Sequence, residues 1–256
     1  CPEPVYDDDI FQADFVYITH WHFDHLHAAS LRRFHPDTHF LVPRFPVSNL
    51  VETLNGLGFQ TVTELGHGRA FELAPGFQIR SYQISFQDDS ACFVEADGVV
   101  IANLYLPNGN PLPGPKFDYK LAWMERLRAR MAELWAQEIP TVVLGDFNVI
   151  PEDKDVWSVR AMANDALMQP ESRDAYRRML GDGWTDAIDT LNPRGGVWTY
   201  WDYQAGAWQR DHGFRIDHLL LSPELADRMQ AAGVDKEYRG REKASDHTPV
   251  WVELAE

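Results

Sequence analysis

Short apolar segments with polar residues at one end recur through the second half of the chain. Each reads as a buried strand, and its polar residues come where the strand meets a loop. In α/β proteins, side chains at such sheet edges build functional sites. The segments are, in chain order, NLYLPNG (103–109), GDFN (145–148), RIDHLL (215–220) and SDHTPV (245–250). They predict an α/β protein with a polar site at the edge of a sheet.

Helix and strand signals alternate along the rest of the chain. Residues 117–137 carry apolar side chains at three- and four-residue steps, which predicts a long helix that serves packing only. Residues 46–57 predict a shorter helix, and Asp97–Gly98 predicts a tight turn between two strands. Strands are expected at 14–19, 38–43, 141–148, 215–221 and 248–254, with helices and long loops over 157–213.

Together and in this order, the four polar segments resemble the endonuclease/exonuclease/phosphatase superfamily, in particular its exonuclease III branch. KFDYK (116–120) and WTYWDY (198–203) are also similar to that branch, so the resemblance covers about residues 99–256. It implies a phosphodiesterase acting on DNA, at 3′ ends or at abasic sites, with Mg²⁺ or Mn²⁺ as cofactor.

The resemblance implies a role for each polar residue. Phosphodiester hydrolysis needs an activated water, a cation on the phosphoryl oxygens and donors for the developing charge. Asp146 would orient or deprotonate the water and share the metal with Asp246, because both offer hard oxygen ligands. Asn148 would hold the water or a phosphate oxygen. His247 would donate a hydrogen bond to the phosphate, with Asp217 fixing its tautomer.

Three further residues are implicated by the same resemblance. Tyr105 and Asn108 would contact the phosphate or stabilise the leaving oxygen. Trp201 would pack against a sugar or a base. A lone aromatic residue is as often part of a core, so Tyr105 and Trp201 could equally be structural.

The first half carries a different motif, THWHFDHLH at residues 19–27, directly after a predicted strand. His20, His22, Asp24 and His25 form the pattern H-x-H-x-D-H. This set suits Zn²⁺, manganese or iron as a metal site. The alternative is a histidine-rich surface loop that binds no metal.

This motif, together with residues 86–104, resembles the metallo-β-lactamase superfamily over about residues 1–104. The resemblance implies Zn²⁺ or iron at the histidine motif. That superfamily takes further ligands from later segments, and His67, Asp88 and Asp89 are the only nearby candidates. The early asparagine and metal-binding glutamate of the exonuclease III family are not recognisable in residues 1–98.

The chain therefore reads as a hybrid with domains at 1–98 and 99–256. Both families are four-layer α/β/β/α sandwiches with two mixed sheets and helices outside, so this architecture is expected here. The expected function is an exonuclease III-type nuclease, impaired by the missing first half. The alternatives are a metallo-β-lactamase-fold hydrolase and a hybrid without catalytic activity.

The composition of the chain limits the binding partners and the cellular compartment that are expected for it. The net charge of −16 disfavours nonspecific nucleic-acid binding, although carboxylates that hold cations also make a chain acidic. Cys1 and Cys92 cannot form a disulfide framework, so a reducing, cytoplasmic setting is expected. The first ten residues lack the basic and apolar stretches of a signal peptide. No membrane partner is expected, and the chain is taken to be a monomer.

Overall fold

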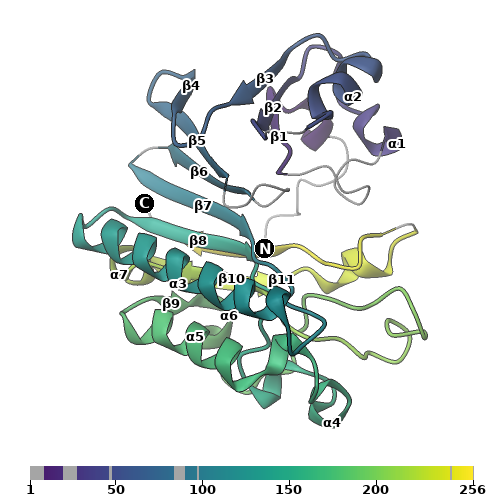
Figure 1. Cartoon of the computed structure of the whole chain (residues 1–256), viewed down its shortest axis with the longest axis vertical. Helices are drawn as coiled ribbons and strands as arrows, with labels where there is room; N and C mark the ends of the chain where they lie inside the picture. The colour runs from purple at the N-terminus through teal and green to yellow at the C-terminus, as the bar shows by residue number, and fades with distance from the viewer. Residues whose placement is uncertain are drawn as a thin grey trace. The chain divides into compact units, whose positions relative to one another are not determined.

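The computed structural model describes residues 9–19, 28–45, 48–83, 90–96, 98–242 and 244–255. The chain divides into two compact units, Cys1–Asp97 and Gly98–Glu256 (Figure 1). Each unit contains both strands and helices, which confirms the predicted α/β class. The division falls one residue before the boundary proposed from the change in sequence character.

The first unit is built from short elements. These are η1 (Asp9–Gln12), β1 (Phe15–Tyr17), α1 (Ala28–Leu31), β2 (His39–Pro43), α2 (Leu50–Gly56), β3 (Val62–Leu65), β4 (Ala70–Ala74), β5 (Phe77–Gln83) and β6 (Ser90–Ala96). Strands β1, β2 and β3 form a parallel sheet, whereas β4, β5 and β6 pair in antiparallel fashion.

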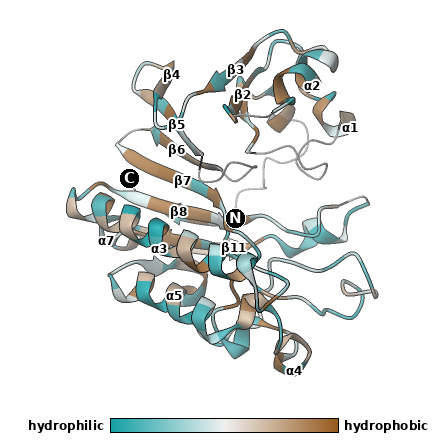
Figure 2. Cartoon of the chain, viewed as in Figure 1, coloured by the Kyte–Doolittle hydropathy of each residue, from teal (hydrophilic) through white to brown (hydrophobic). Residues whose placement is uncertain are grey.

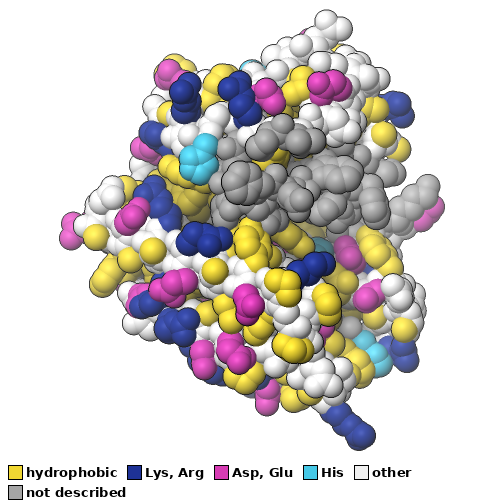
Figure 3. Space-filling model, in the orientation of Figure 1, with side chains coloured by type: hydrophobic (Ala, Val, Ile, Leu, Met, Phe, Trp, Pro, Cys, Tyr) yellow, Lys and Arg dark blue, Asp and Glu magenta, His cyan; other side chains and the backbone are white. Residues whose placement is uncertain are grey.

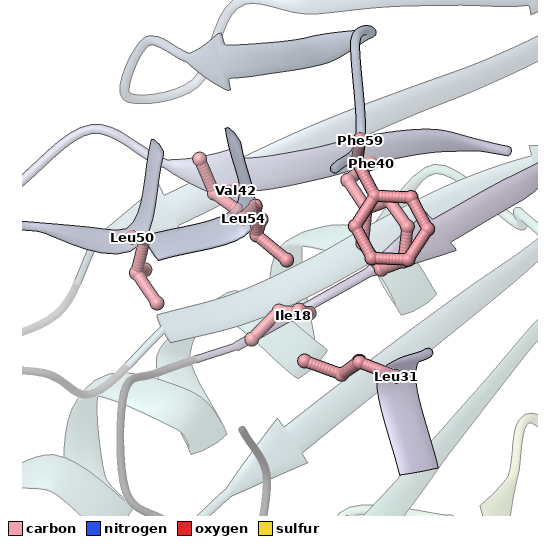
Figure 4. Packing of buried hydrophobic residues seen from close by; sticks show 7 residues of the cluster. All are labelled: Ile18, Leu31, Phe40, Val42, Leu50, Leu54 and Phe59. Atoms are coloured by element: carbon pink, nitrogen blue, oxygen red, sulfur yellow. The ribbon is translucent and has the colours of Figure 1, made fainter. Parts of the chain in front are cut away.

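Strand β2 forms the centre of this unit because both of its faces are buried. Phe40 and Val42 point into a cluster that Figure 4 shows from close by. The cluster consists of Ile18, Leu31, Phe40, Val42, Leu50, Leu54 and Phe59. Leu41 points the other way, into a second cluster with Leu65, Ile79 and Cys92. A strand covered on both faces explains the uninterrupted apolar run FLV in the sequence.

The second unit contains longer elements and the predicted polar segments. Its elements are β7 (Val99–Tyr105), α3 (Pro115–Ala136), β8 (Thr141–Asp146), η2 (Asp153–Asp155), α4 (Val159–Met162), η3 (Ala166–Met168), α5 (Pro170–Gly181), β9 (Thr185–Asp186), α6 (Ala187–Leu191), β10 (Asp217–Leu221), α7 (Pro223–Ala226), β11 (Met229–Val234), η4 (Lys236–Gly240) and β12 (Val250–Leu254). Strands β7, β8, β10 and β9 lie in that order, and β11 pairs with β12.

The sheet of this unit is mixed, as predicted. Strand β7 runs parallel to β8, whereas β10 is antiparallel to both β8 and β9. Figure 2 colours most of β7 and β8 as hydrophobic, in line with strands that supply the core. The ends of β7 and β8 and the start of β10 therefore meet at one edge of the sheet.

Helix α3 confirms the long helix expected at 117–137. It begins with Pro115. The missing N–H of a proline removes no hydrogen bond here, because the N–H groups of the first turn have no acceptor within the helix. Its buried face includes Trp123, Met124 and Leu127, and the helix packs beside α5 (Figure 1). The same face also buries Lys120, which the periodicity does not explain.

Some predicted boundaries differ from the structure. The shorter predicted helix is α2, which begins at Leu50, while residues 46 and 47 lie outside the described part. Gly98 has a φ of +76°, as a tight turn requires, while Asp97 is not among the described residues. Among the described residues, none of the helices combines the length and apolar character needed to cross a bilayer.

Candidate active site

The pairing of three strands brings three of the predicted residues to one sheet edge. Tyr105 at the end of β7 pairs with Asp146 at the end of β8, and Asp146 pairs with Asp217 at the start of β10. Gly145 allows this approach, because a Cβ there would lie 2.0 Å from the carbonyl oxygen of Leu104. The glycine of the GDFN segment is therefore required by packing.

His247 joins this edge from the loop that precedes β12. Its Nδ1 donates to the Asp217 carboxylate, at 2.9 Å from Oδ2 and 3.1 Å from Oδ1. Its Nε2 lies 4.0 Å from Oδ2 of Asp146. The ring of Tyr200 meets the imidazole edge-on, with 5.0 Å between ring centroids. The imidazole is thus fixed in orientation, with Nε2 on the side of Asp146.

Asn148 holds the carboxylate of Asp146. Its backbone N–H donates to Oδ1 at 2.8 Å, and its side-chain Nδ2 donates to Oδ2 at 3.0 Å. Nδ2 also donates to the carbonyl of Leu106 at 2.8 Å. Both amide hydrogens are therefore used within the protein, and a hydrogen bond from Nδ2 to a phosphate oxygen would have to replace one of them.

Asn108 lies on the other side of Asn148. Its Nδ2 donates to Oδ1 of Asn148 at 3.0 Å, and its own Oδ1 accepts from the backbone and side chain of Asn110. Asn110 in turn donates to Asp165 at 3.1 Å. A hydrogen-bonded row of amides thus links the loop after β7 to the loop after β8.

The charges at this edge shift one another's pKa values. Burial, together with the charge of Asp217, raises the pKa of the Asp146 carboxyl to about 7. Burial would lower the pKa of the His247 imidazole, but the carboxylates of Asp217, Asp146 and Asp246 outweigh it and raise the pKa to about 9. At neutral pH the site therefore holds an imidazolium beside a carboxyl group that readily exchanges a proton.

Lys120 is a residue at this site that the sequence pattern did not reveal. Its side chain is fully buried, and Nζ donates to the carbonyls of Asn108 at 3.0 Å and Asn148 at 2.5 Å. Burial lowers the pKa of this amine to about 7 against the opposing effects of Asp146 and Asp165. A lysine on the apolar face of a predicted helix was the available signal.

Asp246 acts on the site through its charge. Its Oδ1 accepts from Ser245, and its charge raises the pKa values of His247 and Tyr200. No group of three or more His, Cys, Asp or Glu side chains among the described residues is arranged to hold a metal ion. Two carboxylates with water and phosphate oxygens would still suit Mg²⁺, which commonly binds proteins in this way.

The predicted substrate contact by Trp201 is wrong. The side chain is fully buried, its indole N–H donates to Asp211 at 3.0 Å, and its ring packs edge-on against Trp208. Neighbouring residues of an extended segment point to opposite sides, so the preceding residue, Tyr200, takes the place beside His247. The sequence alone did not say which aromatic residue of WTYWDY faces the site.

A buried ionic network lies beside this edge. Arg215 donates to the carboxylates of Asp155 at 2.9 Å and Asp186 at 2.6 Å, and to Nδ1 of His218 at 2.9 Å. His218 donates from Nε2 to the carbonyl of Val149. His218 is thus structural, and the network joins the start of β10 to the loop that follows β8.

The histidine motif of the first half is not among the residues that the structure describes. His20, His22, Asp24 and His25 lie outside the described residues, as do Asp88 and Asp89. The predicted Zn²⁺ or iron site therefore stays a prediction.

Known proteins resemble the chain over most of its length. A model of the endonuclease/exonuclease/phosphatase family matches residues 11–247. An exodeoxyribonuclease of Bacillus subtilis is 30% identical over 165 residues, which cover 64% of this chain and 63% of the relative. This chain thus spans less than two thirds of the length of that relative.

Solved structures show the same likeness. An AP endonuclease from Archaeoglobus fulgidus superposes with a TM-score of 0.62 at 27% identity, covering 70% of this chain and 80% of the other. A 3′ phosphatase from Neisseria bound to a product DNA hairpin gives a TM-score of 0.65 at 25% identity, covering 80% of this chain and 94% of the other.

The family match changes the interpretation of the first half. It begins at residue 11 and so includes most of the segment interpreted as metallo-β-lactamase-like. The match gives no support to a metallo-β-lactamase half or to a hybrid of two families.

Proposed function

Because the chain belongs to the endonuclease/exonuclease/phosphatase family, we propose that it is a divalent-metal-dependent phosphodiesterase of exonuclease III type. Its substrate is DNA, cleaved at 3′ ends or at abasic sites. The observation that carries the proposal is the convergence of five polar residues at one sheet edge. Hydrogen bonds join Asn108, Asn148 and Asp146 to one another and Asp217 to His247, and Nε2 of His247 lies 4.0 Å from Oδ2 of Asp146. The names of the relatives, which are DNA nucleases and AP endonucleases, support this class of substrate.

Asp146 is the proposed base for the attacking water. Its pKa of about 7 allows it to accept a proton at neutral pH, and its two bonds from Asn148 fix the direction of its carboxylate. Asn148 therefore acts by orienting Asp146, while its Oδ1 keeps a lone pair that a water could use.

His247 is the proposed donor to the phosphate. Its Nδ1 is occupied by Asp217, so the proton on Nε2 is the one available to a phosphoryl oxygen. A pKa of about 9 keeps the ring cationic at pH 7, which offsets the negative charge that develops in the transition state.

Tyr105 and Asn108 are proposed to serve the leaving oxygen. The pairing of Tyr105 with Asp146 in the sheet supports this role. Asn108 uses one amide hydrogen on Asn148, and the other would be donated to the departing oxygen.

A divalent cation, Mg²⁺ or Mn²⁺, is proposed to bind between Asp246 and Asp146. When bound, it would supply a Lewis acid for a phosphoryl oxygen. The negative surroundings of His247 support a cation here, since three carboxylates act on one imidazole.

The surface charge is consistent with specific binding of DNA at the site rather than with nonspecific binding over the surface. On the face shown in Figure 3, basic and acidic side chains are interspersed rather than separated into a basic stripe. With a net charge of −16, affinity for DNA would come from the site and its cation more than from a general field.

The test is cleavage of two labelled DNA duplexes, one with a recessed 3′ end and one with an abasic site, with Mg²⁺ or with EDTA. We expect Mg²⁺-dependent cleavage of at least one duplex, lowered about 100-fold or more in His247→Ala. His212→Ala is the matched control, because His212 stacks on Trp157 and contacts no residue of the site described above. Failure of the folded wild type to cleave either duplex would refute the proposal and favour a chain without catalytic activity.

A further inference from the structure

We infer that Lys120 is a positioning residue, which holds the backbone carbonyls of Asn108 and Asn148 and thereby sets the direction of both amide side chains. The inference rests on the proposed function, since it gives those amides a role in the reaction. It adds a residue from helix α3 to a site otherwise built by loops and strand ends.

Lys120 joins elements that are far apart in the chain. It lies in the second turn of α3, whereas its two acceptors lie in the loops that follow β7 and β8. Nζ lies 3.0 Å from the carbonyl oxygen of Asn108 and 2.5 Å from that of Asn148. One amino group therefore fixes the distance between the two loops.

The backbone of Asn148 explains why its carbonyl matters. Its φ is +49°, a left-handed conformation that asparagine tolerates better than most residues. In this conformation its N–H reaches Oδ1 of Asp146 while its carbonyl reaches Lys120. Releasing the carbonyl would allow the residue to relax, and the carboxylate of Asp146 would lose its fixed direction.

The packing around Lys120 is matched to its stem. Gly109 has a φ of +93°, and a Cβ there would lie 2.7 Å from Cδ of Lys120 and 3.2 Å from Cβ of Ala166. The loop after Asn108 thus closes over the lysine stem only because residue 109 has no side chain.

A buried amine at this position is unfavourable in itself. Moving a polar group out of water costs free energy unless the group is hydrogen-bonded, and an apolar side chain would pack here at a lower cost in free energy. Trp123, Met124 and Leu127 show that the same face of α3 is otherwise apolar. The hydrogen bonds to the two loops are what distinguish Lys120 from these neighbours.

The experiment compares Lys120→Met with Met124→Ala in the chain of residues 1–256. Both variants disturb the buried face of α3, but only the first removes the donors to the loops. With abasic-site DNA and saturating Mg²⁺, we expect K120M to lose about 10- to 100-fold in kcat with KM changed less than about threefold. M124A is expected to lose thermal stability while keeping kcat within about twofold, and Lys120→Arg, which restores donors, to exceed K120M in kcat.

Hydrogen exchange supplies a readout that does not need activity. The N–H of Asn148 is expected to exchange faster in K120M relative to the amides of Leu219 and Leu220, and to stay protected in M124A. If K120M does not fold, Lys120→Gln takes its place. An unchanged kcat and unchanged exchange at Asn148 would overturn the inference, as would an equal loss of kcat in M124A. If the wild type cleaves no DNA, the proposed function fails and exchange at Asn148 alone decides the role of Lys120.

Discussion

The carboxylate of Asp217 accepts a hydrogen bond from Nδ1 of His247 at 2.9 Å, although the two residues are 30 positions apart in the chain. Asp217 begins β10, and His247 lies in the loop before β12, so the pair forms only when the second unit is folded. The bond fixes the tautomer of the imidazole and leaves Nε2 available on the side of Asp146.

Replacing Asp217 with Asn should therefore lower both the nuclease rate and the pKa of His247. Without the carboxylate, the pKa of the imidazole should fall from about 9 toward its ordinary value of 6.5. At pH 8 most of the imidazolium would be lost, and kcat should fall about 100-fold or more. The measurements are an NMR titration of His247 and kcat on abasic-site DNA, with the fold checked by circular dichroism.

Asp182→Asn is the control for that substitution. Asp182 is also paired with a basic side chain, Arg128, but the pair lies on α3 and at the end of α5. Its removal should leave the pKa of His247 and kcat unchanged. Unchanged kinetics in Asp217→Asn would count against the role of the pair.

The pKa of Asp146 leads to a second prediction, that Asp146→Asn stabilises the metal-free protein at neutral pH. The pKa is raised from 3.8 to about 7, so the fold favours the protonated form. Stability from this group is complete below pH 4 and is lost as the pH rises to about 7, since the unfolded chain ionises first.

The expected gain follows from that sign. One pKa unit is about 1.4 kcal/mol, but Asn keeps only one of the two acceptors that face Asn148, so a net gain of about 1–2 kcal/mol is expected at pH 8. Thermal unfolding in EDTA should show a Tm raised by a few degrees at pH 8 and no gain at pH 4. If Asp146→Asn had the same Tm as the wild type at pH 8 as well as at pH 4, the burial of this charge would be contradicted.

The network around Arg215 gives a third prediction. Arg215→Met leaves the buried carboxylates of Asp155 and Asp186 without their cation, which should cost about 3–5 kcal/mol of unfolding free energy. Arg177→Met breaks an exposed pair with Asp174 and should cost less than about 1 kcal/mol. Hydrogen exchange of the β10 amides measures both, and similar costs would show that burial does not decide the effect.

Much of the second unit could be predicted because its signals are local. The apolar periodicity of α3 and the apolar runs of β8 and β10 are patterns among neighbouring residues. The structure has these elements close to the positions that the sequence predicts. The strand ends that carry Asp146 and Asp217 follow from the same patterns, and their meeting follows from the parallel and antiparallel pairing of the sheet.

Other features depend on contacts between distant segments, which local patterns do not contain. The period of α3 places Lys120 on the buried face but says nothing of the carbonyls that accept from it. Trp201 and Tyr200 are adjacent aromatic residues, and only the pairing of Tyr200 with His247 shows which of them faces the site. The resemblance of the first half to a second family rests on one short motif and one hairpin, and the family match over residues 11–247 does not support it.

The last prediction concerns the affinity for metal. Asp146 already accepts two hydrogen bonds from Asn148, one on each carboxylate oxygen, which leaves fewer lone pairs for a cation. Asp246 is the other proposed ligand, and the described residues offer no cluster of three or more acidic or histidine ligands. Mg²⁺ demands near-octahedral oxygen ligands and gives up its waters reluctantly, so two carboxylates should hold it loosely.

We expect half-maximal cleavage of abasic-site DNA at Mg²⁺ concentrations on the order of 1 mM, and a higher requirement in Asp246→Asn. Asp182→Asn, which removes an acidic group outside the site, should leave the Mg²⁺ dependence unchanged. Full activity at micromolar Mg²⁺ would mean that a carboxylate beyond Asp146 and Asp246 completes the site.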